Sequence, residues 1–369
     1  MLASTTAVLA VLAAGADLAV SHQHAAPARA RKSVAARYLS AAPVARILSI
    51  TPRLYLALSG LREGKSATLR SLGEMIYDPV ASADFRYLAT PYGQVLSLTG
   101  PGAPALRRTK LSINEYEESP ANSAFADRDL YAVVLGSSAG FGSTENPISL
   151  EALATGRSQS LGIGDNVAGD PAGPGVFTSV AAAIRPTAEA TQLFPDSRVQ
   201  LREAGRPRVT LATIAQLDRD VRLPSGAQAA LLPFPDPAGD MVAIAVQPTE
   251  PDQHAGVVVL TRTGRVVQTF TGLSGLISPA WTQSGRSLAF ATSGPQPALH
   301  IWTGGRTRVV SLPVGEYGSC VWSPDGAWAL CARVGPAATG QSWFLSSASG
   351  SITVRTTGPG FPIAWLGGR

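Results

Sequence analysis

Two glycine-containing segments partly resemble nucleotide-binding loops. Gly60–Ser66 has three residues between its glycines, whereas a phosphate-binding loop needs four so that consecutive backbone N–H groups surround the phosphates. Gly162–Gly169 has its third glycine in the wrong place for a dinucleotide fingerprint, and no strand–helix–strand unit surrounds it. We therefore interpret Gly60–Ser66 as a hairpin between strands and Gly162–Gly169 as a flexible rim loop.

The four histidines do not have the spacing of a metal site or a catalytic site. His22 and His24 lie in an Ala-rich and Arg-rich segment, His254 lies in a polar segment, and His300 alternates with Trp302 in a strand-like run. No Gly-x-Ser-x-Gly motif accompanies them. The sequence therefore predicts no catalytic residue, no metal site and no cofactor, although catalytic groups gathered from several repeats would leave no local motif.

The two cysteines, Cys320 and Cys331, flank a predicted tight turn. If Trp322 pairs with Ala327 across this turn, Cys331 lies diagonally opposite Cys320 on the same face, and a small change in the turn makes the two direct partners. A disulfide is then sterically allowed in an oxidising compartment, and two buried free thiols are the alternative. Two cysteines in 369 residues exclude a disulfide-dense scaffold and a Cys₄ zinc site.

The cysteines belong to a strand–turn–strand unit that recurs along the chain. In Cys320–Cys331, the run Ser-Pro-Asp-Gly places proline and glycine where a type I turn prefers them. Ala280–Phe290 repeats this unit closely. Weaker copies are Ala81–Ala89, Phe125–Val133 and Phe234–Ile244.

A second hairpin follows each unit and turns at a glycine, which supplies the positive φ that such turns need. These glycines recur every 40 to 59 residues, at Gly60, Gly100, Gly156, Gly205, Gly264, Gly304 and Gly350. Within the strands, large and small apolar residues alternate, as in Met241–Val246, which suits a sheet packed between two neighbouring sheets. Four strands per repeat of this length indicate the blades of a β-propeller.

The two ends of the chain complement each other. First strands are expected near residues 77, 122, 175, 230, 278, 319 and 362, and the last, Phe361–Leu366, leaves no room for three more strands. The early strands Ala45–Ile50, Arg53–Leu58 and Ser66–Leu72 lack a first strand. Joining the ends removes an open sheet edge. We therefore predict an all-β fold, a seven-bladed β-propeller closed by its N- and C-terminal strands and preceded by an N-terminal apolar helix.

The turns and strands of Ala280–Phe290 and Cys320–Cys331 resemble the TolB-like and WD-type β-propeller repeats, and the resemblance extends over residues 44–369. The Trp-Asp and Gly-His pairs that mark WD repeats are missing, which favours the TolB-like class of exported bacterial proteins. This resemblance implies a scaffold that often makes protein contacts, and it transfers no catalytic residues.

The N-terminal region differs from the rest in composition. Residues 2–20 are apolar apart from Asp17, so residues 1–21 are predicted to be a signal or membrane-anchor helix, with residues 22–43 as a basic Ala/Pro linker and residues 44–369 as the propeller domain. No basic residue precedes the apolar run and several follow it, which by the positive-inside rule would put the following segment in the cytoplasm. Either the orientation is unusual or Met1 lies within a longer signal. We favour a Met1 that lies within a longer signal, and a disordered Ala-rich tail is the alternative.

The positive charge is confined to the same region. Residues 21–70 carry nine basic groups against one acidic group, whereas residues 71–369 carry 21 basic and 23 acidic groups. A nucleic-acid binder would spread a basic face over its folded domain, so we expect no nucleic-acid partner.

Taken together, these features predict a non-catalytic, extracytoplasmic scaffold. We expect a monomer, secreted or tethered to the membrane through its N-terminal segment, that binds a protein or peptide partner. The long polar insertions Ser137–Pro147, Gly162–Gly175 and Gln247–Gly256 are the candidate binding loops, unless they are neutral surface insertions. The alternative is an extracytoplasmic propeller enzyme, a hydrolase or lyase, with its site at the central channel.

Overall fold

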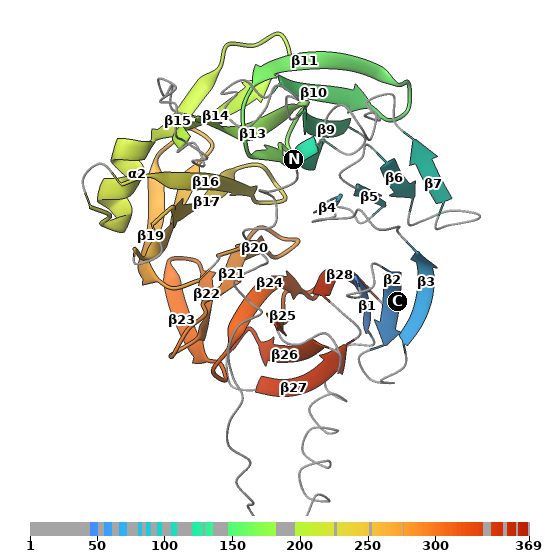
Figure 1. Ribbon diagram of the computed structural model, residues 1–369, viewed down its shortest axis with the longest axis vertical. Coiled ribbons are helices and arrows are strands. Elements are labelled where there is room, and N and C mark those ends of the chain that lie inside the picture. Colours follow the sequence, from blue (N-terminus) through green and yellow to red (C-terminus); the bar gives the residue numbers. More distant parts are fainter. Residues whose placement is uncertain are drawn as a thin grey trace, which may run out of the picture.

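The strands form seven four-stranded antiparallel sheets around a common centre (Figure 1). The computed structural model describes residues 45–50, 55–60, 66–71, 80–82, 86–89, 94–97, 105–108, 120–127, 130–135, 147–181, 196–224, 227–250, 253–275, 277–334, 341–349, 353–358 and 361–367. The predicted N-terminal helix and linker, residues 1–21 and 22–43, lie outside these ranges.

The first three sheets follow the N-terminal part of the chain. Sheet 1 combines β28 (Phe361–Gly367) with β1 (Ala45–Ile50), β2 (Tyr55–Gly60) and β3 (Ser66–Ser71). Sheet 2 contains β4 (Val80–Ala81), β5 (Tyr87–Ala89), β6 (Gln94–Ser97) and β7 (Ala105–Arg108). Sheet 3 contains β8 (Pro120–Ala126), β9 (Leu130–Leu135), β10 (Pro147–Ala152) and β11 (Arg157–Ile163).

The other four sheets have the same sequential order. Sheet 4 contains β12 (Val167–Gly169), β13 (Gly175–Ala181), β14 (Asp196–Glu203) and β15 (Val209–Thr213). Sheet 5 contains β16 (Ala229–Pro235), β17 (Met241–Pro248), β18 (Ala255–Thr261) and β19 (Val266–Leu273). Sheet 6 contains β20 (Ala280–Trp281), β21 (Ser287–Ala291), β22 (Ala298–Thr303) and β23 (Arg306–Ser311). Sheet 7 contains β24 (Glu316–Trp322), β25 (Trp328–Val334), β26 (Gln341–Ser347) and β27 (Thr353–Gly358).

The last strand of the chain pairs with the first. β28 runs antiparallel to β1, with Trp365 opposite Ile47 and Leu366 opposite Arg46. β28 also contacts β24 of sheet 7 and β4 of sheet 2. Figure 1 shows the first strands β4, β20 and β24 near the centre and the fourth strands on the perimeter, and β28 takes the same inner position in sheet 1.

A buried side-chain oxygen closes the inner turn of several sheets. Ser82, Asp236, Thr282 and Ser323 each follow the first strand, are at most 2% exposed, and accept the backbone N–H of the residue five positions on, at 2.9 to 3.1 Å. In the turn Ser323–Gly326, the N–H of Gly326 also donates to the carbonyl oxygen of Ser323 at 2.8 Å, as the predicted type I turn requires. The polar atom replaces water that cannot reach the buried turn.

Indole groups connect the first strands of neighbouring sheets. Trp281 Nε1 donates to the carbonyl oxygen of Phe234 at 2.8 Å, and Trp322 Nε1 donates to that of Ala280 at 2.9 Å. These bonds join sheet 5 to sheet 6 and sheet 6 to sheet 7. Trp365 holds the matching place on β28 and packs against Trp328, Leu330, Ala332, Trp343 and Leu345 of sheet 7.

In the cysteine hairpin, Trp322 pairs with Ala329 and not with Ala327, so the second of the two registers considered from the sequence is the one found. This register puts Cys320 directly opposite Cys331, with 4.2 Å between their Cα atoms. The sulfurs are joined in a disulfide inside the packing layer between sheets 6 and 7.

The prediction of a flexible rim loop at Gly162–Gly169, within the candidate binding loop Gly162–Gly175, was wrong. Ile163 ends β11, Val167–Gly169 is the first strand of sheet 4, and Gly175 begins the second strand, which the sequence had suggested as the first. Gly169 marks a close approach between the backbones of sheets 3 and 4 and does not belong to a loop. A Cβ on Gly169 would lie 1.4 Å from the carbonyl oxygen of Phe125 in sheet 3.

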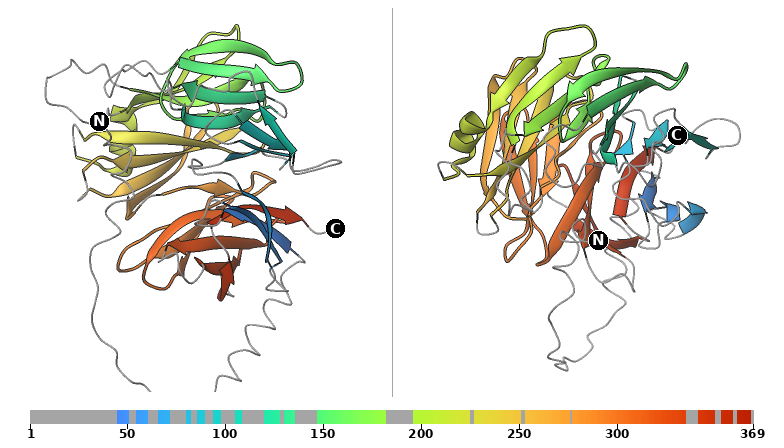
Figure 2. Two further views of the ribbon diagram at one scale, coloured as in Figure 1. Left: turned by 45° about the vertical axis from the view of Figure 1, so that its right-hand side comes forward. Right: turned by 45° about the horizontal axis from the view of Figure 1, so that its top comes forward.

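The structure also contains a helix that the all-β prediction missed, α2 (Ile214–Val221), on the outside of the ring (Figures 1 and 2). Gln216 Oε1 accepts the N–H of Thr213 at 2.9 Å, as in a capping box. Leu217 and Val221 are buried with the core shared by sheets 4 and 5. The helix therefore depends on this packing, since eight residues are too few for a stable isolated helix.

Gly169→Ala tests the close approach of sheets 3 and 4. We expect a loss of at least about 2 kcal/mol in the free energy of unfolding, because the methyl group displaces a backbone carbonyl that cannot rotate away. Gly173→Ala is the control, since its Cβ would meet only Asp170 Oδ2 at 3.7 Å, and its loss should stay below about 0.5 kcal/mol. Urea unfolding measures both variants, and equal losses would contradict the assigned approach.

Candidate functional site

The fourth strands of sheets 4, 5 and 6 present exposed valines to solvent, and exposed arginines lie within the strand of sheet 6 and directly before that of sheet 5. Val209 is 44% exposed, Val266 46%, Val267 40% and Val309 57%. Their strands β15, β19 and β23 follow one another along the perimeter (Figure 1). We call the following residues the perimeter surface: Val209, Arg265, Val266, Val267, Arg306, Arg308 and Val309.

The fold itself exposes these side chains. Each of the three strands is the last in its sheet, so one edge of its backbone has no strand partner among the described residues. Inward-facing residues such as Leu211 and Phe270 are buried and anchor the strands. None of the three strands contains an acidic residue. The arrangement therefore offers unpaired backbone groups, apolar side chains and positive charge together, which suits contact with a partner chain.

A buried ion cluster connects sheets 4 and 5 beside this surface. Asp170 is fully buried at the inner turn of sheet 4, and both its oxygens accept hydrogen bonds from Arg262, at 2.7 and 2.6 Å. Arg262 Nη2 also lies 2.5 Å from Glu203 Oε1, and Glu203 in turn pairs with the exposed Arg206. The hydrogen bond to Asp170, opposed by burial, raises the pKa of Arg262.

The position of Arg262 in its hairpin explains this link. It lies in the turn between β18 and β19, where Gly264 has φ +85° and packs against Leu211 of β15. A Cβ on Gly264 would lie 2.4 Å from the carbonyl oxygen of Leu211. The hairpin tip of sheet 5 is thus fixed against sheet 4, and the neighbouring Arg265 and Val266 are presented from a rigid base.

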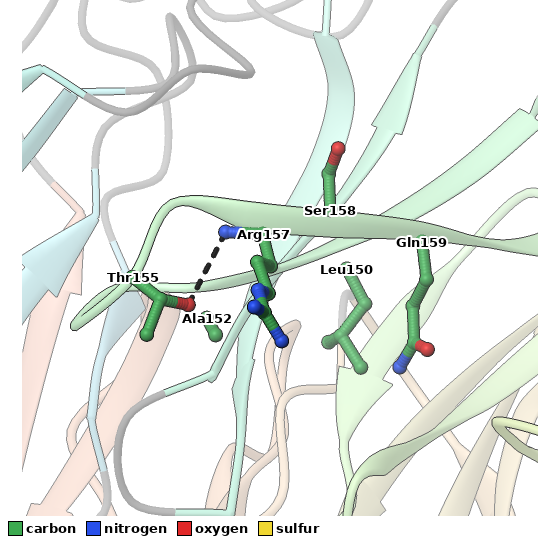
Figure 3. Close-up of a pocket in the computed structure, with 6 residues that line it drawn as sticks. All are labelled: Leu150, Ala152, Thr155, Arg157, Ser158 and Gln159. Carbon is green, nitrogen blue, oxygen red and sulfur yellow. Dashed lines mark hydrogen bonds between the residues drawn. The ribbon is translucent and has the colours of Figure 1, made fainter.

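A pocket of about 270 Å³ lies near the tip of the β10–β11 hairpin. Figure 3 shows Leu150, Arg157 and Gln159 pointing to one side of the hairpin and Ser158 to the other, while Arg157 N–H donates to Thr155 Oγ1 at 3.3 Å. Its lining of leucine, alanine, hydroxyl, amide and guanidinium groups contains no carboxylate, imidazole or thiol. The pocket can hold a polar group, but its lining provides no general base.

The histidines of the β-rich region have separate surroundings. His254 is exposed. His300 stacks on Phe290 with ring centroids 5.0 Å apart, and burial lowers its pKa. Burial also raises the pKa of Asp218 on α2 to about 6. Among the described contacts, neither the imidazole of His300 nor the carboxyl group of Asp218 lies beside a nucleophilic side chain.

The remaining sequence candidates are placed as follows. β2 and β3 pair around Gly60–Ser66, with Ser59 opposite Ser66, in agreement with the hairpin interpretation. Residues 137–146 of the first candidate loop and residues 251–252 of the third lie outside the described ranges. Within the described ranges, no three His, Cys, Asp or Glu side chains are grouped to hold a metal ion.

In the part of the chain that the structure describes, no helix has both the length and the apolar character required to span a membrane.

Sequence reasoning missed both the perimeter surface and the ion cluster. An Arg-Val pair recurs at three fourth strands, directly before β15 and β19 at Arg208 and Arg265 and within β23 at Arg308, and this recurrence was the available signal. The ion cluster left no comparable signal, because Asp170 and Arg262 are 92 residues apart.

Comparison with known proteins supports the fold. No protein-family model and no curated protein matches the sequence. Among solved structures, the β-propeller domain of Myceliophteria thermophila Cps50 (Swd1) is 12% identical, with a TM-score of 0.52 over 80% of this chain and 90% of that one. Oligogalacturonate lyase from Vibrio parahaemolyticus is 9% identical, with a TM-score of 0.52 over 85% and 91%.

TolB from Acinetobacter baumannii is 11% identical over 90% of this chain and 86% of that one, with a TM-score of 0.44, which is too low to support an argument. The two matches at 0.52 have the same arrangement of sheets despite their low identity. The chain therefore has a β-propeller fold.

Arg262→Gln tests the buried ion cluster. We expect a loss of about 2–4 kcal/mol in the free energy of unfolding, because the variant leaves the carboxylate of Asp170 buried without its cation. Arg206→Gln is the matched control, since Arg206 is 73% exposed and its pair with Glu203 should contribute less than about 1 kcal/mol. Thermal and urea unfolding measure both, and similar losses would contradict the assignment.

Proposed function

We propose that this chain is a non-catalytic, seven-bladed propeller scaffold that binds a protein or peptide partner through the perimeter surface. The seven sheets are its blades, and the pairing of β28 with β1 closes the ring. The exposed valines on three consecutive terminal strands, together with the exposed Arg265, Arg306 and Arg308, carry this proposal. An extended partner segment with acidic and apolar residues can add to such an edge by backbone hydrogen bonds.

The proposed partner site differs from the loops that the sequence suggested. Gly162–Gly175 forms strands and a tight turn and is not free to act as a loop. The perimeter surface instead lies on strands that neighbouring sheets hold in place. Such a surface requires little ordering when a partner binds, which favours affinity.

We also propose that the protein acts outside the cytoplasm, secreted or tethered through residues 1–21, with residues 22–43 as the linker. The disulfide between Cys320 and Cys331 supports this compartment, because such bonds persist in oxidising environments.

A channel enzyme of the hydrolase or lyase class is the second candidate. It is supported by the fold that this chain shares with an oligogalacturonate lyase. Release of unsaturated sugar ends from oligogalacturonate by the purified full chain would favour this candidate over the scaffold.

Charge reversal on the perimeter surface tests the scaffold proposal. Arg265→Glu with Arg308→Glu should reduce recovery of the partner at least about tenfold in affinity capture from the native cells, because it places negative charge where an acidic segment binds. Arg286→Glu is the control, since Arg286 is also exposed but lies in the inner turn of sheet 6. Equal recovery with all three proteins would contradict the proposed surface.

Thiol trapping in intact cells tests the compartment. If the protein is exported, Cys320 and Cys331 should resist an alkylating reagent added at lysis and react only after chemical reduction. Mass spectrometry counts the labelled thiols. Complete labelling before reduction would place the chain in a reducing compartment and contradict export.

A further inference from the structure

Three arginines of sheet 4 converge on the face that is turned toward sheet 3. Arg198 and Arg202 share one face of β14, and Arg208 directly precedes β15. A Cβ on Gly162, at the end of β11, would lie 3.1 Å from Arg202 Nη1 and 3.2 Å from Arg208 Nη2. Two guanidinium groups from one sheet therefore reach the same point above the backbone of the next sheet.

The central guanidinium, that of Arg202, has only neutral partners. Arg202 is 2% exposed. Its Nε and Nη2 donate to Gln200 Oε1 at 3.3 and 3.0 Å, and its Nη1 donates to the carbonyl oxygen of Leu161 at 3.3 Å. Gln200 Nε2 donates to Thr210 Oγ1 at 3.2 Å, which fixes its amide. These bonds occupy three of the five N–H groups of Arg202.

No described carboxylate neutralises this group of charges. Among the described residues, the guanidinium groups of Arg198 and Arg208 form no ion pair, and Nε of Arg198 is buried without a hydrogen-bond partner. Burial and then the charges of Arg208 and Arg198 lower the pKa of Arg202 to about 10. Arg262, by contrast, has a raised pKa beside Asp170. A buried cation beside two like charges is unfavourable unless an anion compensates it.

We propose that Arg198, Arg202 and Arg208 bind the phosphate or sulfate group of a ligand at the boundary between sheets 3 and 4, beside Gly162. A group of three positive charges matches a dianion better than a monoanion, and a tetrahedral oxyanion has enough oxygens to accept from several guanidinium groups. Arg208 is exposed, so the anion can reach the buried Arg202 from solvent. This site is independent of partner binding at the perimeter surface.

Titration of the purified full chain with inorganic phosphate and with inorganic sulfate tests the site. At constant ionic strength in chloride, calorimetry should show saturable binding of at least one of the two, and thermal unfolding should show a rise in Tm. Acetate, a planar monoanion, should bind at least about tenfold more weakly. If phosphate binds more tightly than sulfate, the ligand carries a phosphate group, and if sulfate binds more tightly, the ligand carries a sulfate group.

Matched variants assign the binding to the three arginines. Arg208→Gln should weaken binding at least about tenfold, because it removes a charged donor from an exposed position without disturbing the core. Arg308→Gln is the control, since Arg308 is also exposed and also precedes a valine, and its binding should be unchanged. Arg202→Lys keeps the charge but loses the planar fork, so it should also weaken binding in a protein with unchanged circular dichroism.

Three results would overturn the proposal: no saturable binding of either oxyanion, equal binding of acetate, or equal affinity of the Arg208→Gln and Arg308→Gln variants. Partner capture separates this site from the proposed scaffold function. Arg208→Gln should retain the partner while losing the oxyanion, whereas the Arg265→Glu and Arg308→Glu variant should show the opposite pattern.

Discussion

The packing of a sheet between two neighbours, as in sheet 5 between sheets 4 and 6, is the constraint on which the rest of this structure depends. On β17, Val242 and Ile244 face the core shared with sheet 4, whereas Ala243 faces sheet 6, where Phe290 and Trp302 fill the space. A sheet with two buried faces carries mainly apolar residues on both, so β17 alternates large and small apolar side chains. Hydrophobic burial on both faces makes the ring rigid and leaves the perimeter and the ends of the strands for polar chemistry.

The way in which neighbouring sheets are joined changes around the ring. Trp281 and Trp322 join the first strands of sheets 5, 6 and 7 by indole hydrogen bonds to backbone carbonyl oxygens. At the boundary between sheets 3 and 4, Gly169 takes the corresponding place, and Asp127 N–H donates directly to the carbonyl oxygen of Asp170 at 2.8 Å. Asp170 then bonds to Arg262 of sheet 5. Sheet 4 is therefore fixed to its neighbours by a backbone hydrogen bond and an ion pair at the place where sheets 5, 6 and 7 use indole groups.

Much of the fold could be predicted because its signals are local. The turn at Ser323–Gly326 and the glycines at hairpin tips such as Gly205 and Gly264 are recognisable within a few residues. The sequence did not predict α2, whose only local sign is Thr213 followed three residues later by Gln216. It also did not predict the arginine group, because Gly162 and Arg208 meet only when two sheets pack. Local patterns therefore predict the strands, whereas the candidate sites depend on contacts between sheets.

The departures from the repeat are concentrated in sheet 4 and at its two boundaries. A chain that repeats one unit needs no buried Asp170 bound to Arg262, no buried Arg202 and no helix to form the ring, since sheets 6 and 7 pack without them. Each of these features costs desolvation or irregular backbone, and natural sequences keep such costs mainly where function requires them. The desolvation cost of the buried charges of sheet 4 therefore supports the boundary between sheets 3 and 4, and not the regular sheets 6 and 7, as the proposed ligand site.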